Sequence, residues 1–243
     1  MSADQPIAAI VNQVTTTSPA YNGSYSGASS GAPKVYLPAV VREYYGWNNE
    51  LAIQNTSMTN SVGITIKFYR GDGSYVSGAD KTDTIPAKGV GYYNIAGAEY
   101  AALGTKFNGS AVVSANDNTT GLVVAVNQTT SNGMMQSYTG FTTGYETVYV
   151  PDLLVGWYRW NSALKVQNVG SQATTVTVTY SDGVVVTRTL DAGAAYQFYQ
   201  PVENHGTKWQ GAATITTSGG DRKIVAIVSQ ATDAALALSL IHI

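Results

Sequence analysis

Few side chains in this sequence could carry acid–base chemistry, and those that could are scattered. The chain has two histidines, His205 and His242, and neither recurs with a serine and an aspartate in a triad-like arrangement. Four acidic residues could pair as general acid and base: Glu43, Glu50, Asp80 and Asp83. Cysteine is absent, which excludes a thiol nucleophile, a thiolate metal site and disulfides. The pattern favours acidic residues on solvated loops and a protein that is not an enzyme.

One short acidic motif could hold a cation. Asn116-Asp117-Asn118 supplies oxygen ligands of the kind that calcium takes. It lacks the loop spacing and the closing glutamate of an EF-hand. We interpret it as a polar hairpin turn, and we expect no metal site and no cofactor.

Two aromatic clusters could stack on sugar rings. They read Tyr44-Tyr45-Gly46-Trp47 and Trp157-Tyr158-Arg159-Trp160. Aromatic side chains also dominate packing at interfaces, and recurrence of the cluster at a fixed interval favours that structural role. We therefore predict a set of aromatic residues at the junction of repeats: Tyr36, Trp47, Tyr149 and Trp160.

Composition limits the partners. The net charge is −2 and only 12% of residues are charged, so nothing predicts nucleic-acid binding. The sequence contains no stretch of about 18 apolar residues, so membrane insertion is not predicted. Sequons for N-glycosylation stand at Asn22, Asn55, Asn108, Asn118 and Asn127. Of these, Asn22 and Asn118 fall in expected loops and are the predicted glycosylation positions, whereas Asn127 falls in an expected core strand.

The elements that carry these residues form an internal repeat. Val35-Tyr36-Leu37-Pro38 returns 113 residues later as Val148-Tyr149-Val150-Pro151. The pairs Trp-Asn and Gln-Asn return at the same interval, and a strand ending in Val-Asn-Gln returns after 102 residues as Val-Ser-Gln. A fixed interval with several separate matches predicts two copies of one structural unit.

Within each unit the apolar residues alternate with polar ones. Ile64, Ile66 and Phe68 alternate with threonine, lysine and tyrosine, which is typical of half-buried antiparallel strands. Gly71-Asp72-Gly73 and Ser181-Asp182-Gly183 supply hairpin chemistry. About seven strands per unit are expected, in the first unit near 35–41, 50–56, 62–70, 82–86, 89–95, 109–115 and 121–129. The predicted fold class is all-β, with two tandem immunoglobulin-like antiparallel β-sandwich domains preceded by a surplus N-terminal strand.

The surplus strand is the third copy of an apolar segment ending in glutamine. It reads Ile7-Ala8-Ala9-Ile10-Val11-Asn12-Gln13, against one such segment in each unit. Apolar residues point to both of its faces, so it requires cover. Either it belongs to a preceding repeat of a longer protein, or it pairs into a neighbouring subunit by strand donation. The expected subunit-contact residues are Ile7, Ala9, Ile10, Val11 and Gln13.

The predicted organisation has six parts. These are a donor-like strand at 1–14, a Tyr/Ser/Gly linker at 15–33, sandwich repeat 1 at 34–130, a connector at 131–146, sandwich repeat 2 at 147–232, and a tail at 233–243. Within the linker, Tyr21-Asn22-Gly23 echoes the Tyr-Thr-Gly of the connector. The tail lacks such a connector, and its ending Leu-Ser-Leu-Ile-His-Ile resembles translated adaptor sequence, so we assign it to neither repeat.

Across these motifs the chain resembles the tandem immunoglobulin-like β-sandwich repeats of prokaryotic cell-surface proteins. In general design it is also similar to extracellular filament subunits that polymerise by donating an N-terminal strand. The resemblance implies an extracellular or cell-surface location and no catalytic residues. The function it implies is a structural subunit of a filament or surface layer, a homopolymer assembled head to tail. The alternative is a carbohydrate-binding adhesin module that recognises surface glycans.

Overall fold

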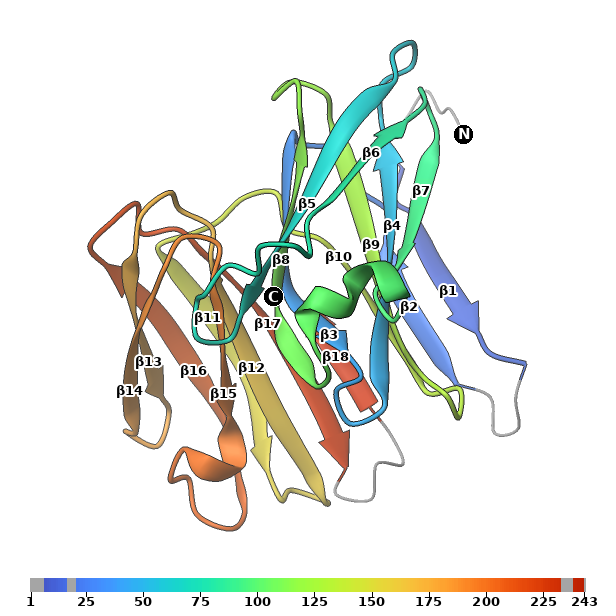
Figure 1. Cartoon of the computed structure of the whole chain (residues 1–243). Helices are drawn as coiled ribbons and strands as arrows, with labels where there is room; N and C mark the ends of the chain where they lie inside the picture. Colours follow the sequence, from blue (N-terminus) through green and yellow to red (C-terminus); the bar gives the residue numbers. More distant parts are fainter. Residues whose placement is uncertain (1–6, 17–20, 233–237, 243) are drawn as a thin grey trace.

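A computed structural model describes residues 7–16, 21–232 and 238–242 of the chain. Predictions that fall on residues 1–6, 17–20, 233–237 and 243 lie outside these ranges. The described part forms two β-sandwiches side by side, with a separate hairpin on the far side of the first sandwich (Figure 1). Among the described residues, no helix has both the length and the apolar character needed to cross a membrane.

The first sandwich has eight antiparallel strands in two sheets. The strands are β3 (Lys34–Arg42), β4 (Trp47–Asn55), β5 (Val62–Arg70), β6 (Lys81–Ile85), β7 (Val90–Asn94), β8 (Phe107–Ala115), β9 (Leu122–Thr130) and β10 (Met135–Thr139). We call the sheet β3-β8-β5-β6 sheet 1A and the sheet β10-β9-β4-β7 sheet 1B. A short 3-10 helix, η1 (Ala98–Leu103), precedes β8.

The second sandwich repeats this topology. Its strands are β11 (Thr147–Val155), β12 (Trp160–Asn168), β13 (Thr174–Tyr180), β14 (Val185–Leu190), β15 (Ala195–Tyr199), β16 (Trp209–Ser218), β17 (Ile224–Thr232) and β18 (Leu238–His242). The sheet β11-β16-β13-β14 is sheet 2A, and β15-β12-β17-β18 is sheet 2B. A 3-10 turn, η2 (Gln200–Val202), follows β15. The predicted fold class is confirmed, and all seven expected strands of the first unit are present.

Each sandwich also has an eighth strand that the sequence did not reveal. β10 lies in the predicted connector 131–146, and β18 lies in the predicted tail 233–243. Both are edge strands that pair along the strand ending in glutamine, β10 with β9 and β18 with β17. Backbone hydrogen bonds hold an edge strand without any required alternation of apolar side chains, so this sequence pattern could not predict them.

The surplus strand likewise has a partner within its own chain. β1 (Ile10–Val14) pairs antiparallel with β2 (Asn22–Ser26), which lies inside the predicted linker 15–33. The two strands form a two-stranded sheet of their own. The expected lone strand is therefore one strand of a hairpin, and the glycine- and serine-rich segment predicted as linker supplies the other.

The repeated motifs have structural roles. Pro38 and Pro151 sit where the register of β3 and β11 shifts at a β-bulge, a place that tolerates the missing proline N–H. Asn48 and Asn161 accept backbone N–H groups across the turns that follow β3 and β11, at 2.8 and 2.9 Å. Asn55 and Asn168 are each fully buried, and both amides bridge loops at the end of the core. Asn55 donates to Ile85 O and Asn168 to Leu190 O.

Candidate functional site

The N-terminal hairpin copies the hairpin that closes each sandwich. In β1–β2, Gln13 stands opposite Gly23 and Val11 opposite Tyr25; in β9–β10, Gln128 stands opposite Gln136 and Val126 opposite Tyr138. The register therefore aligns Ser-Tyr-Ser-Gly at 24–27 with Ser-Tyr-Thr-Gly at 137–140. This corrects the expected echo at Tyr21-Asn22-Gly23, which is four residues out of register.

The hairpin lacks the other six strands of a sandwich. In β9, the core-facing side chains of Leu122, Val124 and Val126 are fully buried. The matching positions before and within β1 are Ile7, Ala9 and Val11. Ile7 is 58% and Val11 37% exposed, although burying such a side chain normally stabilises by about 1.5–3 kcal/mol. The predicted contact residues are thus displayed to solvent, with Ala9 and Ile10 also exposed and Gln13 half-buried.

The core-facing residues of the hairpin match the second sandwich and not the first. β17 presents Ile224, Ala226 and Val228 to the core, and all three are fully buried. At the matching positions the N-terminal segment also has isoleucine, alanine and valine. The first sandwich has leucine, valine and valine there instead. The N-terminal hairpin therefore carries the closing strand of a second-type sandwich.

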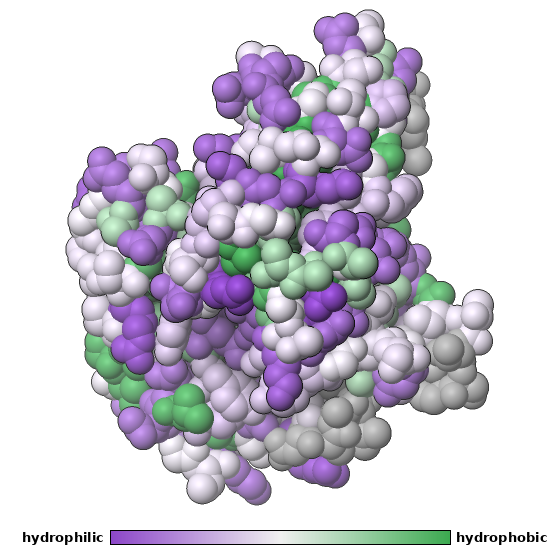
Figure 2. All heavy atoms as spheres, viewed as in Figure 1, coloured by the Kyte–Doolittle hydropathy of each residue, from purple (hydrophilic) through white to green (hydrophobic). Residues whose placement is uncertain are grey.

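Polar contacts hold the hairpin on the outer face of sheet 1B. The Ser137 hydroxyl donates to Gln13 Oε1 at 3.3 Å, and the Thr139 hydroxyl donates to Ser26 O at 2.8 Å. A side chain at Gly23 would come within 2.5 Å of Ser137 Oγ, so the two strands approach closely. On the face seen in Figure 2, hydrophobic residues form small separate patches among hydrophilic ones, and one patch lies over the hairpin.

The two sandwiches contact each other through outer sheet faces. The outer face of sheet 2B packs on the outer face of sheet 1A, and Val225 and Ile227 of β17 join the hydrophobic cluster of the first sandwich. Gln167, fully buried, donates to Ala111 O at 3.3 Å and to Gly193 O at 2.9 Å. Ser110 Oγ donates to the same Gly193 carbonyl at 2.9 Å. The contact is therefore close and combines these apolar side chains with buried hydrogen bonds.

Lys165 is enclosed in this contact. Its Nζ donates to Asn108 Oδ1, while Asn108 Nδ2 donates to Gln197 Oε1 at 3.0 Å. Burial lowers the pKa of Lys165 to about 7, because the charged ammonium loses its hydration there. No sequence pattern predicted this lysine, because its role depends on a contact between residues 57 positions apart.

The four predicted junction aromatics divide into two pairs. Tyr36 is half-buried against the first hydrophobic cluster, and Trp47 lines a cleft of about 640 Å³ between the sandwiches. Tyr149 is 71% exposed on sheet 2A, and Trp160 is half-buried at the turn after β11, where its backbone pairs with Trp157. Only the first-sandwich members of the predicted set lie at the junction within the chain.

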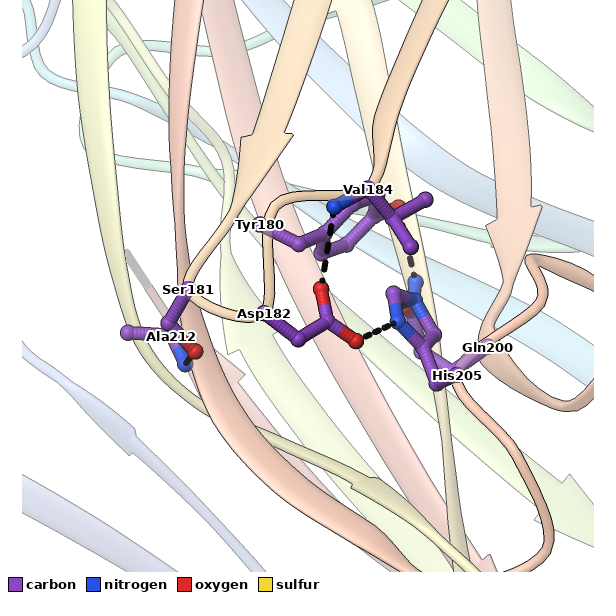
Figure 3. A network of polar contacts seen from close by, with 7 residues as sticks. All are labelled: Tyr180, Ser181, Asp182, Val184, Gln200, His205 and Ala212. Carbon is purple, nitrogen blue, oxygen red and sulfur yellow. Dashed lines mark hydrogen bonds and ion pairs between the residues drawn. The ribbon is translucent and has the colours of Figure 1, made fainter.

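A polar network closes one end of the second sandwich (Figure 3). His205 is buried, with Nδ1 2.8 Å from Asp182 Oδ2 and Nε2 3.1 Å from Gln200 Oε1. The ring stacks on Trp209 with centroids 4.1 Å apart. Burial alone would raise the pKa of Asp182, but hydrogen bonds from His205 and the Val184 amide outweigh it and hold the pKa below its usual value.

This histidine lacks the geometry of a nucleophilic site. Ser181 precedes Asp182, yet its hydroxyl accepts a hydrogen bond from the Ala212 amide at 3.1 Å. Both imidazole nitrogens are already occupied by Asp182 and Gln200. The network can hold the loop after β13 against η2, which is a structural task.

The sequons differ in access. Asn22 and Asn118 are exposed, whereas Asn55 and Asn127 are buried and Asn108 is engaged between the sandwiches. Next to Asn118, Asp117 accepts the amides of Thr119 and Thr120 at 3.0 and 2.9 Å, which makes the segment a polar turn. Across the described ranges, no cluster of three or more His, Asp or Glu residues could hold a metal ion.

Comparison with known proteins names no relative. No protein-family model matches the chain, and a search of curated proteins finds no match either. Among solved structures, red sea bream transglutaminase aligns with 85% of this chain at a TM-score of 0.16 and 10% identity. The chain spans 31% of that protein's length, and a similarity this low carries no argument about fold or activity.

Proposed function

We propose that this chain is a structural subunit of an extracellular filament or cell-surface layer, of the tandem-sandwich kind that its sequence resembles. Copies join head to tail, and the β1–β2 hairpin of one copy closes the second sandwich of its neighbour. The observation that carries the proposal is the match between the exposed residues Ile7, Ala9 and Val11 and the buried residues of β17.

The second sandwich is the better acceptor for steric reasons. In place of β17, the hairpin would put identical side chains into the core. In place of β9, Ala9 would stand where Val124 fills the core, and each missing methyl-sized group there loses about 0.8 kcal/mol. Because β17 and β18 already close the second sandwich, donation requires the incoming β1–β2 to displace these two strands from β12.

Single-cysteine variants test this donation, since the chain has no cysteine of its own. Ser229 of β17 stands opposite Ala163 of β12, and Asn12 is the position of β1 that matches Ser229. A mixture of Asn12→Cys and Ala163→Cys copies should form disulfide-linked dimers under mild oxidation, because directly opposed Cβ atoms, about 4.5–5.5 Å apart, need only a small approach to reach the roughly 3.5–4.5 Å of a disulfide.

A matched control uses the first sandwich. There Asn127 stands opposite Glu50, so Asn12→Cys mixed with Glu50→Cys should give few dimers. A double variant with Ser229→Cys and Ala163→Cys in one chain should close internally. Equal dimer yields from the two mixtures would refute the choice of acceptor.

Electron microscopy tests the assembly itself. The purified protein should form fibres or sheets, and deleting residues 1–27 should abolish them. Both sandwiches should stay folded in the deletion variant, because their hydrophobic clusters contain none of the described residues of the hairpin. Fibres that persist without the hairpin would contradict donation.

A second function, carbohydrate binding, is favoured by one observation. Tyr45 is 80% exposed, and Tyr44, Tyr45 and Trp47 line the cleft of about 640 Å³ between the sandwiches. Exposed aromatic rings beside polar side chains suit a sugar. Glycan-array binding that is lost in Trp47→Ala and retained in Trp160→Ala, its counterpart in the second sandwich, would support this function. Absence of binding to any glycan would reject it.

A further inference from the structure

Each sandwich leaves open the sheet face that its twin buries. Inside the chain, the outer face of sheet 1A binds the outer face of sheet 2B. The repeat gives sheet 1B the same position in the first sandwich that sheet 2B has in the second, and sheet 2A the same position as sheet 1A. We call the outer face of β4 and β7 face 1B, and the outer face of β11 and β16 face 2A.

Matched residues show that these faces have no partner among the described residues of the chain. Gln54 is exposed on β4, whereas its counterpart Gln167 on β12 is fully buried by the first sandwich. Tyr92, which matches Gln197 by strand register, is 69% exposed on β7. On face 2A, Tyr149 is exposed, whereas its counterpart Tyr36 is half-buried.

We propose that face 1B of one copy binds face 2A of a second copy, in the arrangement by which the two sandwiches bind within the chain. The proposal rests on the proposed function, and it names the second surface through which copies join. The occupant is a second copy because the chain itself contains the complementary face. The contact joins unlike faces, so it is heterologous and continues from copy to copy.

The position of the N-terminal hairpin fits this contact. β2 lies beside β10 of the first sandwich, and β10 in turn lies beside β18 of the second. The hairpin therefore stands where the closing hairpin of a sandwich docked on face 1B belongs. Suppose that a second copy docks on face 1B through β11 to β16 of its second sandwich. The β1–β2 hairpin of the first copy then stands at the position that β17–β18 of the docked copy would otherwise occupy. Docking and donation are thus compatible within one assembled contact, although each can occur without the other.

Crosslinking between copies tests the docking. Within the chain, Lys165 meets Asn108; the matching positions are Ala52 on face 1B and Gln210 on face 2A. A mixture of Ala52→Cys and Gln210→Cys copies, treated with a short bismaleimide, should give at least about ten times more dimer than a mixture of Ala52→Cys and Val202→Cys. Val202 is a suitable control because it is exposed on η2 and belongs to none of the strands that form the two faces.

Two further measurements complete the test. A Lys165→Cys and Asn108→Cys double variant should crosslink within one chain, which shows that the reagent spans this geometry. Ala52→Arg places a large charge on the half-buried centre of face 1B and should reduce the assembled mass measured by light scattering, with unchanged circular dichroism.

Equal dimer yields for Gln210→Cys and Val202→Cys, or an unchanged mass in Ala52→Arg, would overturn the docking. Dimers between Asn12→Cys and Ala163→Cys would then still support donation, so the two proposals fail separately.

Discussion

The two sandwiches share one topology but close the same end of the core with different chemistry. In the first, Leu103 is fully buried beside Phe107, and Phe68 packs edge-on against Phe107. In the second, His205 takes the place of Leu103, and Trp209 takes the place of Phe107. The apolar side chain of Leu103 needs only a matching shape around it. The buried imidazole of His205 also needs Asp182 and Gln200 as hydrogen-bond partners. The fold therefore sets the position of the side chain that closes this end of the core, but it does not determine whether that side chain is apolar or polar.

The outer faces differ in the same way. Ala52 and Gln54 of β4 correspond to Lys165 and Gln167 of β12, yet only the second pair is buried inside the chain. A residue can therefore keep its place in the repeat while its surroundings change from solvent to a polar contact. Substitutions at matched positions separate the effect of the residue from the effect of its surroundings.

The largest effect on stability is expected at Leu103, which closes the end of the first core. Leu103→Ala should lower the free energy of unfolding by about 2–5 kcal/mol, because it removes buried methyl groups and leaves a cavity. Urea unfolding followed by circular dichroism measures this loss. A loss below 1 kcal/mol would show that the end of the first core is loosely packed.

The next effect is expected at His205. His205→Leu gives the second sandwich the residue of the first, but it leaves Gln200 and Asp182 without their ring partner. An unsatisfied buried acceptor costs about 1–3 kcal/mol, so the variant should be less stable despite its greater hydrophobicity. Trp209 fluorescence reports the change directly, because the indole stacks on this ring. A more stable variant would show that the network serves something other than stability.

A smaller effect separates the two repeated glutamines. Gln167→Ala should cost about 1 kcal/mol, because it removes hydrogen bonds to the carbonyls of Ala111 and Gly193. Gln54→Ala should change the stability of the single copy by less than about 0.5 kcal/mol, as expected for an exposed position. Equal costs, measured by urea unfolding at low protein concentration, would contradict the difference in their surroundings.

The smallest effect is expected in the stability of the chain at acid pH. The pKa of Asp182 lies below its usual value in the folded chain, so the stabilisation it gives is present above about pH 4 and is lost as the pH falls through the folded pKa. Asp182→Asn should therefore weaken the fall in stability between pH 5 and pH 2, by at most about 1 kcal/mol. Thermal unfolding across this range measures it. Asp72→Asn, at the matching turn of the first sandwich, should change the acid dependence in the same direction, because hydrogen bonds from Ser74 lower the pKa of Asp72 without any histidine. An unchanged acid dependence in Asp182→Asn would contradict the prediction.

The fold was largely predictable, and the contacts were not. The alternation of Ile64, Ile66 and Phe68 and the 113-residue interval predicted the core strands, because a half-buried strand must alternate. β2 and β18 were not predicted, because backbone hydrogen bonds hold an edge strand and its side chains need not alternate. The His205 network also escaped, because its partners are 5 and 23 residues away and no spacing rule joins them. The burial of Gln167, and the exposure of its twin Gln54, depends on which sheet faces meet.

The joining of unlike faces inside the chain has a consequence for any longer row built the same way. Such a row has polarity: one terminus shows sheet 1B with the N-terminal hairpin, and the other shows sheet 2A with Tyr149. The two termini therefore present different chemistry, and a molecule that binds only sheet 2A would block growth at one terminus and leave the other open.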